Sequence, residues 1–161
     1  MRNTITLIIT ISLLCISCYT LKSTIVDLPD TVRIVEVNES KNDLFVKANN
    51  WMVEAFADAK SVIQFSDKEN GIVTGKYLMN PQYVTLNGMN ATSIPDIYAI
   101  IKIQVKDGAS KITINPSQFE QYDTQNKTLR ESYFSKDKAQ QKINELVNSF
   151  TAFMKQKRDD F

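Results

Sequence analysis

Few residues of the types that most often do chemistry occur in this chain. It has no histidine, which removes the most common general base and a frequent metal ligand. Its two cysteines, Cys15 and Cys18, both lie near the N-terminus, away from any strand or helix pattern. Its four glycines do not form a phosphate-binding loop. We therefore expect no metal site and no cofactor.

One stretch has the spacing of a known nucleophile. Ser135-Lys136-Asp137-Lys138 reads Ser-x-x-Lys, but the Lys-Thr-Gly and Ser-Asp-Asn motifs that accompany such a serine do not occur. Serine is also a favoured N-cap, and a helical pattern follows directly. We therefore interpret Ser135 as an N-cap. Hydrolysis by a pair of Asp or Glu carboxylates needs no histidine, so it stays open as an alternative.

The N-terminal residues indicate export. Residues 1–17 combine Arg2, an apolar run and small residues, which is typical of a signal peptide, and the run is too short to span a bilayer. Leu14-Cys15-Ile16-Ser17-Cys18 is similar to a bacterial lipobox, although Cys15 stands where leucine is usual. We expect cleavage before Cys18 and lipidation of its sulfur, palmitate included. Tyr19, and not an acidic residue, comes directly after Cys18, which favours the outer membrane.

Charge argues against a nucleic-acid partner. The full chain has 19 basic and 18 acidic side chains. Loss of residues 1–17 would remove one basic residue, Arg2, and leave equal numbers of the two. Nucleic-acid binding normally needs a basic surface. Residues 18–30 lack a clear period, and we interpret them as a tether. Residues 31–156 have the size of one domain, and residues 157–161 are a charged tail.

Residues 41–60 predict an amphipathic helix. Ser40 is a natural N-cap, with Asp43 three residues on. Lys47 and Asn50 are placed on the polar face. The helical apolar stripe, which we expect to face the core, consists of Leu44, Phe45, Ala48, Trp51, Met52, Ala55, Phe56 and Ala59.

Strand patterns follow this helix. Residues 62–65 and 72–77 flank a polar loop and predict a hairpin, in which Gly71 suits a positive φ angle and Gly75 a bulge or close backbone approach. Residues 96–108 alternate strictly, and Asp107-Gly108 predicts a type I′ turn. That turn would pair two isoleucines of each strand on one face, namely Ile101 and Ile103 with Ile114 and Ile112.

The remaining segments complete the fold class. Residues 31–37 predict a first strand, the sheet continues to about residue 122, and residues 135–155 predict a second long helix. Residues 79–95 are the least regular part, with a short strand at 83–86. The order is β-α-β-β-β-β-α, which predicts an α+β domain: an antiparallel sheet with two long helices on one face.

Several short motifs in this order resemble one domain family. They are the helix with Trp51, Val62-Ile63-Gln64, Asp67-Lys68-Glu69, Gly71-Ile72-Val73-Thr74-Gly75-Lys76 and Val105-Lys106-Asp107-Gly108. The chain is similar over residues 30–156 to domain of unknown function 4468, found in exported lipoproteins of Gram-negative bacteria. The resemblance implies a fold like that of the TATA-box-binding protein (TBP). It implies no reaction and no active-site residues.

Three functional hypotheses remain. We expect a non-enzymatic lipoprotein, anchored to the outer membrane by Cys18, that binds an envelope protein or peptide. The alternatives are a structural or self-associating envelope component and a carboxylate hydrolase acting on cell-wall material. The expected partner surface is the solvent face of the sheet with the irregular segment at its edge, represented by Tyr83, Leu86, Met89, Lys102, Gln104 and Lys111.

Overall fold

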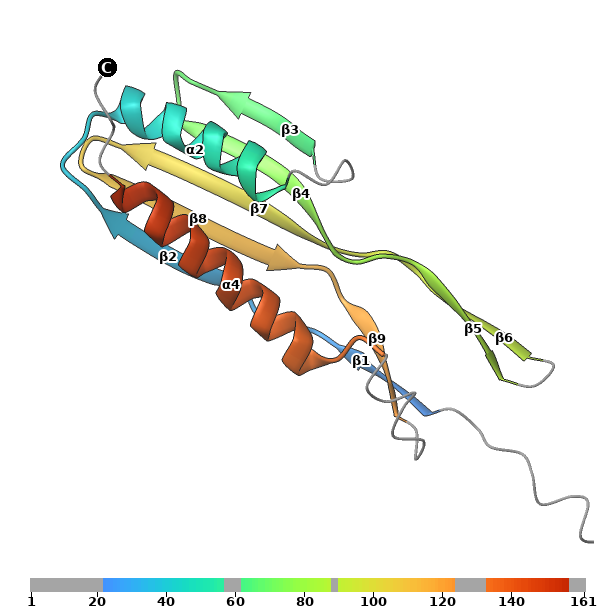
Figure 1. Ribbon diagram of the computed structural model, residues 1–161. Helices are drawn as coiled ribbons and strands as arrows, with labels where there is room; N and C mark the ends of the chain where they lie inside the picture. The colour runs from blue at the N-terminus through green and yellow to red at the C-terminus, as the bar shows by residue number, and fades with distance from the viewer. Residues whose placement is uncertain (1–21, 57–61, 88–89, 124–132, 157–161) are drawn as a thin grey trace, which may run out of the picture.

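The computed structural model describes residues 22–56, 62–87, 90–123 and 133–156. A five-stranded antiparallel sheet in the order β2-β8-β7-β4-β3 carries both long helices on one face (Figure 1). The elements are β1 (Lys22–Val26), β2 (Thr31–Glu36), α2 (Lys41–Ala55), β3 (Val62–Asp67), β4 (Ile72–Asn80), β5 (Tyr83–Asn87), β6 (Asn90–Ile94), β7 (Ile97–Lys106), β8 (Ala109–Pro116), β9 (Phe119–Asp123) and α4 (Lys136–Lys155). The predicted fold class is confirmed. The predicted signal peptide, Cys18 and the tail lie outside the described residues.

The central hairpin of β7 and β8 has the predicted register. Ile103 pairs with Ile112 and Ile101 with Ile114, and all four side chains are completely buried. Full burial of an isoleucine contributes at most about 1.5–3 kcal/mol, so these four form a large part of the core.

The turn of this hairpin is not the predicted type I′. Gly108 has a φ of +80°, but Asp107 does not have a positive φ, which is the sign pattern of a type II turn. Contacts with the segment before α2 account for the difference. The amide of Gly108 donates to the carbonyl of Glu39 at 3.0 Å, and its carbonyl accepts from Val37 at 3.0 Å. A carboxylate oxygen of Asp107 accepts from the first helical amide, Lys41, at 2.7 Å.

The described residues of both predicted stripes face the core; α2 ends at Ala55, and Ala59 of its predicted stripe lies outside the described residues. Trp51 of α2 lies against Phe150 of α4, with ring centroids 5.2 Å apart, and its indole N–H donates to Ser149 at 3.1 Å. Trp51 is therefore a core residue. The fully buried helical side chains are Leu44, Ala48, Trp51 and Met52 from α2, and Ala139, Ile143, Phe150 and Met154 from α4.

The helix N-caps are those predicted. The hydroxyl of Ser40 accepts from the amide of Asp43, and that of Ser135 accepts from the amide of Lys138, both at 3.3 Å. Ser135 therefore satisfies a backbone amide at the start of α4.

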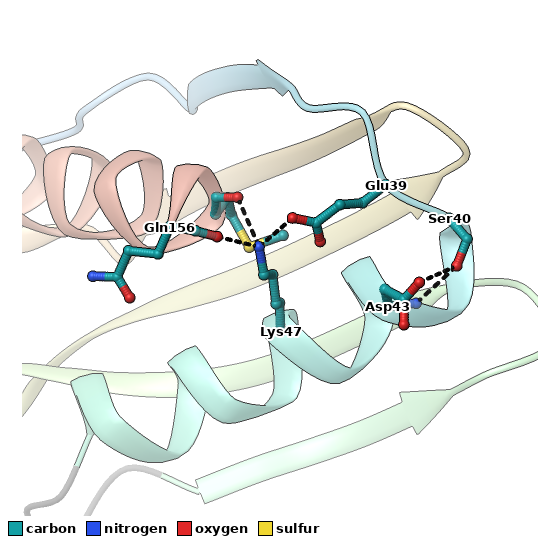
Figure 2. Close-up of polar contacts among 6 residues, drawn as sticks. Glu39, Ser40, Asp43, Lys47 and Gln156 are labelled. Carbon is teal, nitrogen blue, oxygen red and sulfur yellow. Dashed lines mark hydrogen bonds and ion pairs between the residues drawn. The ribbon is translucent and has the colours of Figure 1, made fainter. Parts of the chain in front are cut away.

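Lys47 was placed on the polar face of α2, and this is wrong. The residue is only 9% exposed. Its ammonium group pairs with Glu39 and donates to the carbonyl of Gln156 at 2.6 Å and, more weakly, to that of Met154 at 3.4 Å (Figure 2). The end of α4 lies over this part of α2, so the lysine satisfies carbonyls at that helix end. Periodicity within α2 alone could not reveal this contact.

Gly71 lies in the turn between β3 and β4 and has the predicted positive φ, +65°. Its carbonyl accepts from the amide of Val105 at 2.8 Å, so the two backbones lie close together. Of the two alternatives predicted for Gly75, the bulge is not found at this residue: the register shift lies on the opposite strand, between Ile63 and Phe65.

Two segments predicted to be irregular form β-ribbons. Lys22–Val26, inside the expected tether, pairs as β1 with β9. Residues 79 and 80 continue β4, and the short strand expected at 83–86 is found as β5, which pairs with β6, a strand that was not expected. These strands are short and mixed in composition, so only their long-range pairing identifies them. Figure 1 shows both ribbons extending beyond the same end of the main sheet.

Gly71→Ala should destabilise the protein much more than Gly108→Ala. A Cβ at Gly71 would lie 2.6 Å from the carbonyl oxygen of Val105, whereas one at Gly108 has its nearest neighbour at 3.9 Å. Both carry the cost of a left-handed backbone, about 1–2 kcal/mol, and only Gly71→Ala adds a backbone clash, for a total of about 2–4 kcal/mol. Urea unfolding gives the free energy of unfolding of both variants. Equal losses of stability would contradict the prediction.

Lys47→Ala should lower the free energy of unfolding by about 2–4 kcal/mol, because it leaves the Glu39 carboxylate and two helix-end carbonyls without their donor. The exposed Lys68 provides the control, since Lys68→Ala should change stability by less than about 0.5 kcal/mol. Adding Glu39→Gln to Lys47→Ala should recover part of the loss. Chemical denaturation of the four proteins tests this, and similar values for the two lysine variants would refute it.

Candidate functional site

The face of the main sheet opposite the helices carries the candidate site. Residues paired directly across antiparallel strands point to the same side of a sheet. One row of such pairs runs through all five strands: Phe65, Thr74, Lys102, Thr113 and Val32. The next row is Asp67, Ile72, Gln104, Lys111 and Ile34. No described helix lies over this side, which we call the open face (Figure 1).

The open face exposes large apolar side chains. Val32 and Ile34 on the edge strand β2 are 55% and 60% exposed, Phe65 on the opposite edge strand β3 is 52% exposed, and Ile100 on β7 is 37% exposed. Contacts with another molecule would remove this area from water, so the face is suited to a macromolecular partner.

Lysines lie between these apolar edges. Lys102 and Lys106 of β7 are exposed, and Lys76 of β4 and Lys111 of β8 are partly exposed. The Lys76 ammonium lies 3.7 Å from the centre of the Tyr98 ring, a cation–π contact.

The acidic groups of the face lie at its margin. Asp67, at the end of β3, accepts hydrogen bonds from the amide and side chain of Asn70 at 2.9 and 2.8 Å. These bonds hold the pKa of the Asp67 carboxyl below its usual value. Asp67 therefore closes the turn, which agrees with the solvated loop inferred from the sequence.

The structure brings half of the predicted surface residues together. Gln104 pairs directly with Lys111, and Lys102 lies one row away on the same side. Tyr83 is elsewhere: its ring stacks with Tyr133, just before α4, at a centroid distance of 6.3 Å. Leu86 lies on the β5–β6 ribbon, where its side chain is not described, and Met89 lies outside the described residues.

Sequence reasoning missed the exposed apolar residues of the face. Val32 and Ile34 lie on the open face and Val35 faces the core, so β2 carries apolar residues on both sides, with Arg33 between them. That pattern normally indicates a strand covered on both faces. The apolar residues of this strand were therefore a usable signal that its second face would not be a purely polar surface.

A cavity of about 430 Å³ lies where the β1–β9 ribbon meets the start of β7. Its apolar wall includes Ile97 and Phe119, and its polar groups are already engaged. Asp96 accepts from Tyr98 at 2.7 Å and from the amide of Gln82 at 2.6 Å. Tyr122 donates to Glu120 at 2.6 Å, which raises the pKa of Tyr122 to about 12. Two of these bonds lie at the base of the β5–β6 ribbon and the third lies within β9, so they have a local structural role and we regard the cavity as the weaker candidate.

Other kinds of site find no support in the described part of the chain. Within residues 22–56, 62–87, 90–123 and 133–156, no three Asp, Glu, Cys or His side chains gather closely enough to hold a metal ion. Neither described helix is apolar enough over a sufficient length to cross a bilayer.

Comparison with known proteins identifies the family of this chain. Residues 31–120 match the family model described as a domain of unknown function (DUF4468) with TBP-like fold. A crystal structure of a DUF4468 family protein from Bacteroides ovatus is similar at 13% identity and a TM-score of 0.52, covering 82% of this chain and 89% of that one. A TBP-like protein from Parabacteroides distasonis shows 18% identity and a TM-score of 0.48, covering 80% and 94%. No curated protein matches.

With a family match over more than half of its length and the sheet and helices described above, this chain belongs to the DUF4468 family with TBP-like fold.

Proposed function

We propose that this protein is a lipid-anchored component of the cell envelope that binds another protein through the open face of its sheet and catalyses no reaction. The observation that carries the proposal is the exposure of Val32, Ile34, Phe65 and Ile100 on the side of the sheet that no described helix covers. A fold by itself does not indicate a function, so the proposal rests on this surface and not on the likeness to TBP.

The anchor follows from the N-terminal sequence. Cleavage before Cys18 would place the lipid four residues before β1, which begins at Lys22. Since β1 pairs with β9, the ribbon end of the domain would then face the membrane. The connection to the lipid is much shorter than the predicted tether of residues 18–30. Several acyl chains on one cysteine would hold the protein stably, which one chain does not.

Cys18→Ser should abolish lipid attachment, whereas Cys15→Ser should keep it, because only Cys18 follows the cleavage position of the lipobox-like sequence. Incorporation of labelled palmitate in a Gram-negative host, followed by membrane fractionation, measures both variants. The Cys15→Ser variant should incorporate the label, and the Cys18→Ser variant should not. Label on both variants, or on neither, would contradict Cys18 as the anchor.

Ile34→Ser should strongly reduce capture of an envelope partner, and Val53→Ser should not. Both residues are similarly exposed, 60% and 65%, but Val53 lies on α2 and not on the open face. Each full-length protein, tagged at its C-terminus, would be recovered from detergent-solubilised envelope and its companions quantified. Their unfolding midpoints in urea confirm that both variants fold.

Three results would count against the proposal in different ways. Equal capture by both variants would exclude the open face. Recovery of a second copy of the chain alone would favour the self-associating alternative. Release of sugar fragments from purified cell wall by the protein would favour the carboxylate hydrolase.

A further inference from the structure

Three lysines of the open face lie on one diagonal across three adjacent strands. Lys76 of β4 pairs with Ile100 of β7, and Lys102 follows Ile100 in the next row of β7. Lys111 of β8 pairs with Gln104, one row beyond Lys102 in the same direction. Diagonal neighbours of this kind are about 7–8 Å apart. The sheet therefore holds three ammonium-bearing side chains in a line at regular spacing.

The positive charge of this line is not neutralised within the described residues. Lys76, Lys102 and Lys111 take part in no ion pair there; the ion pair that is seen among the described residues is that of Lys47 with Glu39, on the helical side. Of the acidic side chains near the open face, Glu36 and Asp67 lie on the two edge strands, and two others are held by polar partners close to the Lys76 row: Asp30 accepts from Asn115, and Asp96 accepts from Tyr98. The middle of the face is therefore basic although the whole chain is almost neutral.

The spacing of the lysines matches that of an extended peptide. Side chains on one side of a β-strand recur every second residue, about 6.6–6.8 Å apart. Carboxylates at alternate positions of such a segment would therefore reach successive lysines. A helical partner would match less closely, because side chains three or four residues apart on a helix face are only about 5–6 Å from one another.

We propose that the open face binds an extended acidic segment of a partner protein, with Asp or Glu at alternate positions contacting Lys76, Lys102 and Lys111. This inference rests on the proposed function and specifies its partner. The apolar residues beside the diagonal favour a protein over a nucleic acid or an anionic polysaccharide. Ile100 lies between Lys76 and Asn115 in its row, and Ile34 directly follows Lys111 in its own, so both could contact apolar side chains of the segment.

Exposed ion pairs are weak and screened by salt. Three of them together correspond to about 10–100-fold in affinity, so the complex should weaken measurably as ionic strength rises. The lysine stems would also lie along the bound segment, which adds apolar contact.

The test uses the detergent-solubilised, full-length protein and two short fluorescent peptides of the same composition, rich in Val and Thr. One carries three Glu at alternate positions, and the other carries the same three Glu consecutively. Fluorescence anisotropy should show the alternating peptide binding several-fold more tightly. Replacing the diagonal by Lys76→Gln, Lys102→Gln and Lys111→Gln should weaken its binding at least about tenfold. The control, Lys136→Gln, Lys142→Gln and Lys155→Gln, changes the net charge equally on α4, on the other side of the sheet, and should have little effect.

Equal binding of the two peptides, or no binding of either, would overturn the inference. Tighter binding of single-stranded DNA or polyphosphate with the same lysine dependence would also overturn it, because the face would then be a general anion site.

Capture from the envelope separates this failure from that of the proposed function. If Ile34→Ser abolishes capture and the triple Gln variant retains it, the open face binds a partner but the acidic segment is wrong. If both variants retain capture, the open face itself is wrong.

Discussion

The pairing of β7 with β8 is the constraint on which the rest of this structure depends. Side chains alternate between the two faces of a strand, so a slip of one residue would move all four central isoleucines from the core to the solvent. The same slip would move Lys102 and Lys111 under the helices. The burial of Ile101, Ile103, Ile112 and Ile114 therefore determines which residues reach the open face. Core formation and the geometry of the candidate site have one physical cause.

The turn of this hairpin also positions the first long helix. Asp107 accepts from the first amide of α2, and Gly108 exchanges hydrogen bonds with the segment that leads into it. Further along the helix, Lys47 joins α2 to the carboxyl end of α4. These contacts hold α2 to the hairpin turn and to α4, and no described helix covers the opposite side of the sheet. The exposure of apolar and basic residues on that side is the basis of the binding role proposed above.

The open face has an arrangement that composition conceals. An almost neutral chain can still carry a basic surface if its acidic groups lie elsewhere, and here several acids are engaged: Glu39 by Lys47, Asp107 by α2 and Asp96 by Tyr98. The lysines of β4, β7 and β8 have no such partners among the described residues. Net charge remains a reason to doubt nucleic-acid binding, but it does not describe the local field that a small acidic segment would meet.

The sequence by itself determined the fold class, the two helices with their N-caps, the register of β7 and β8, and the shared side of Lys102, Gln104 and Lys111. These features depend on local periodicity and on a short turn, both of which are readable within one segment. Only the tertiary structure decided the β1–β9 ribbon, the burial of Lys47, the turn type at Asp107 and the separation of Tyr83 from the lysines. In each of these cases the deciding partner is distant in the chain, as Lys22 is from Asp123 and Lys47 from Gln156. No pattern within a short segment can contain such a contact, because the free energy that favours it arises only after the sheet and helices have assembled.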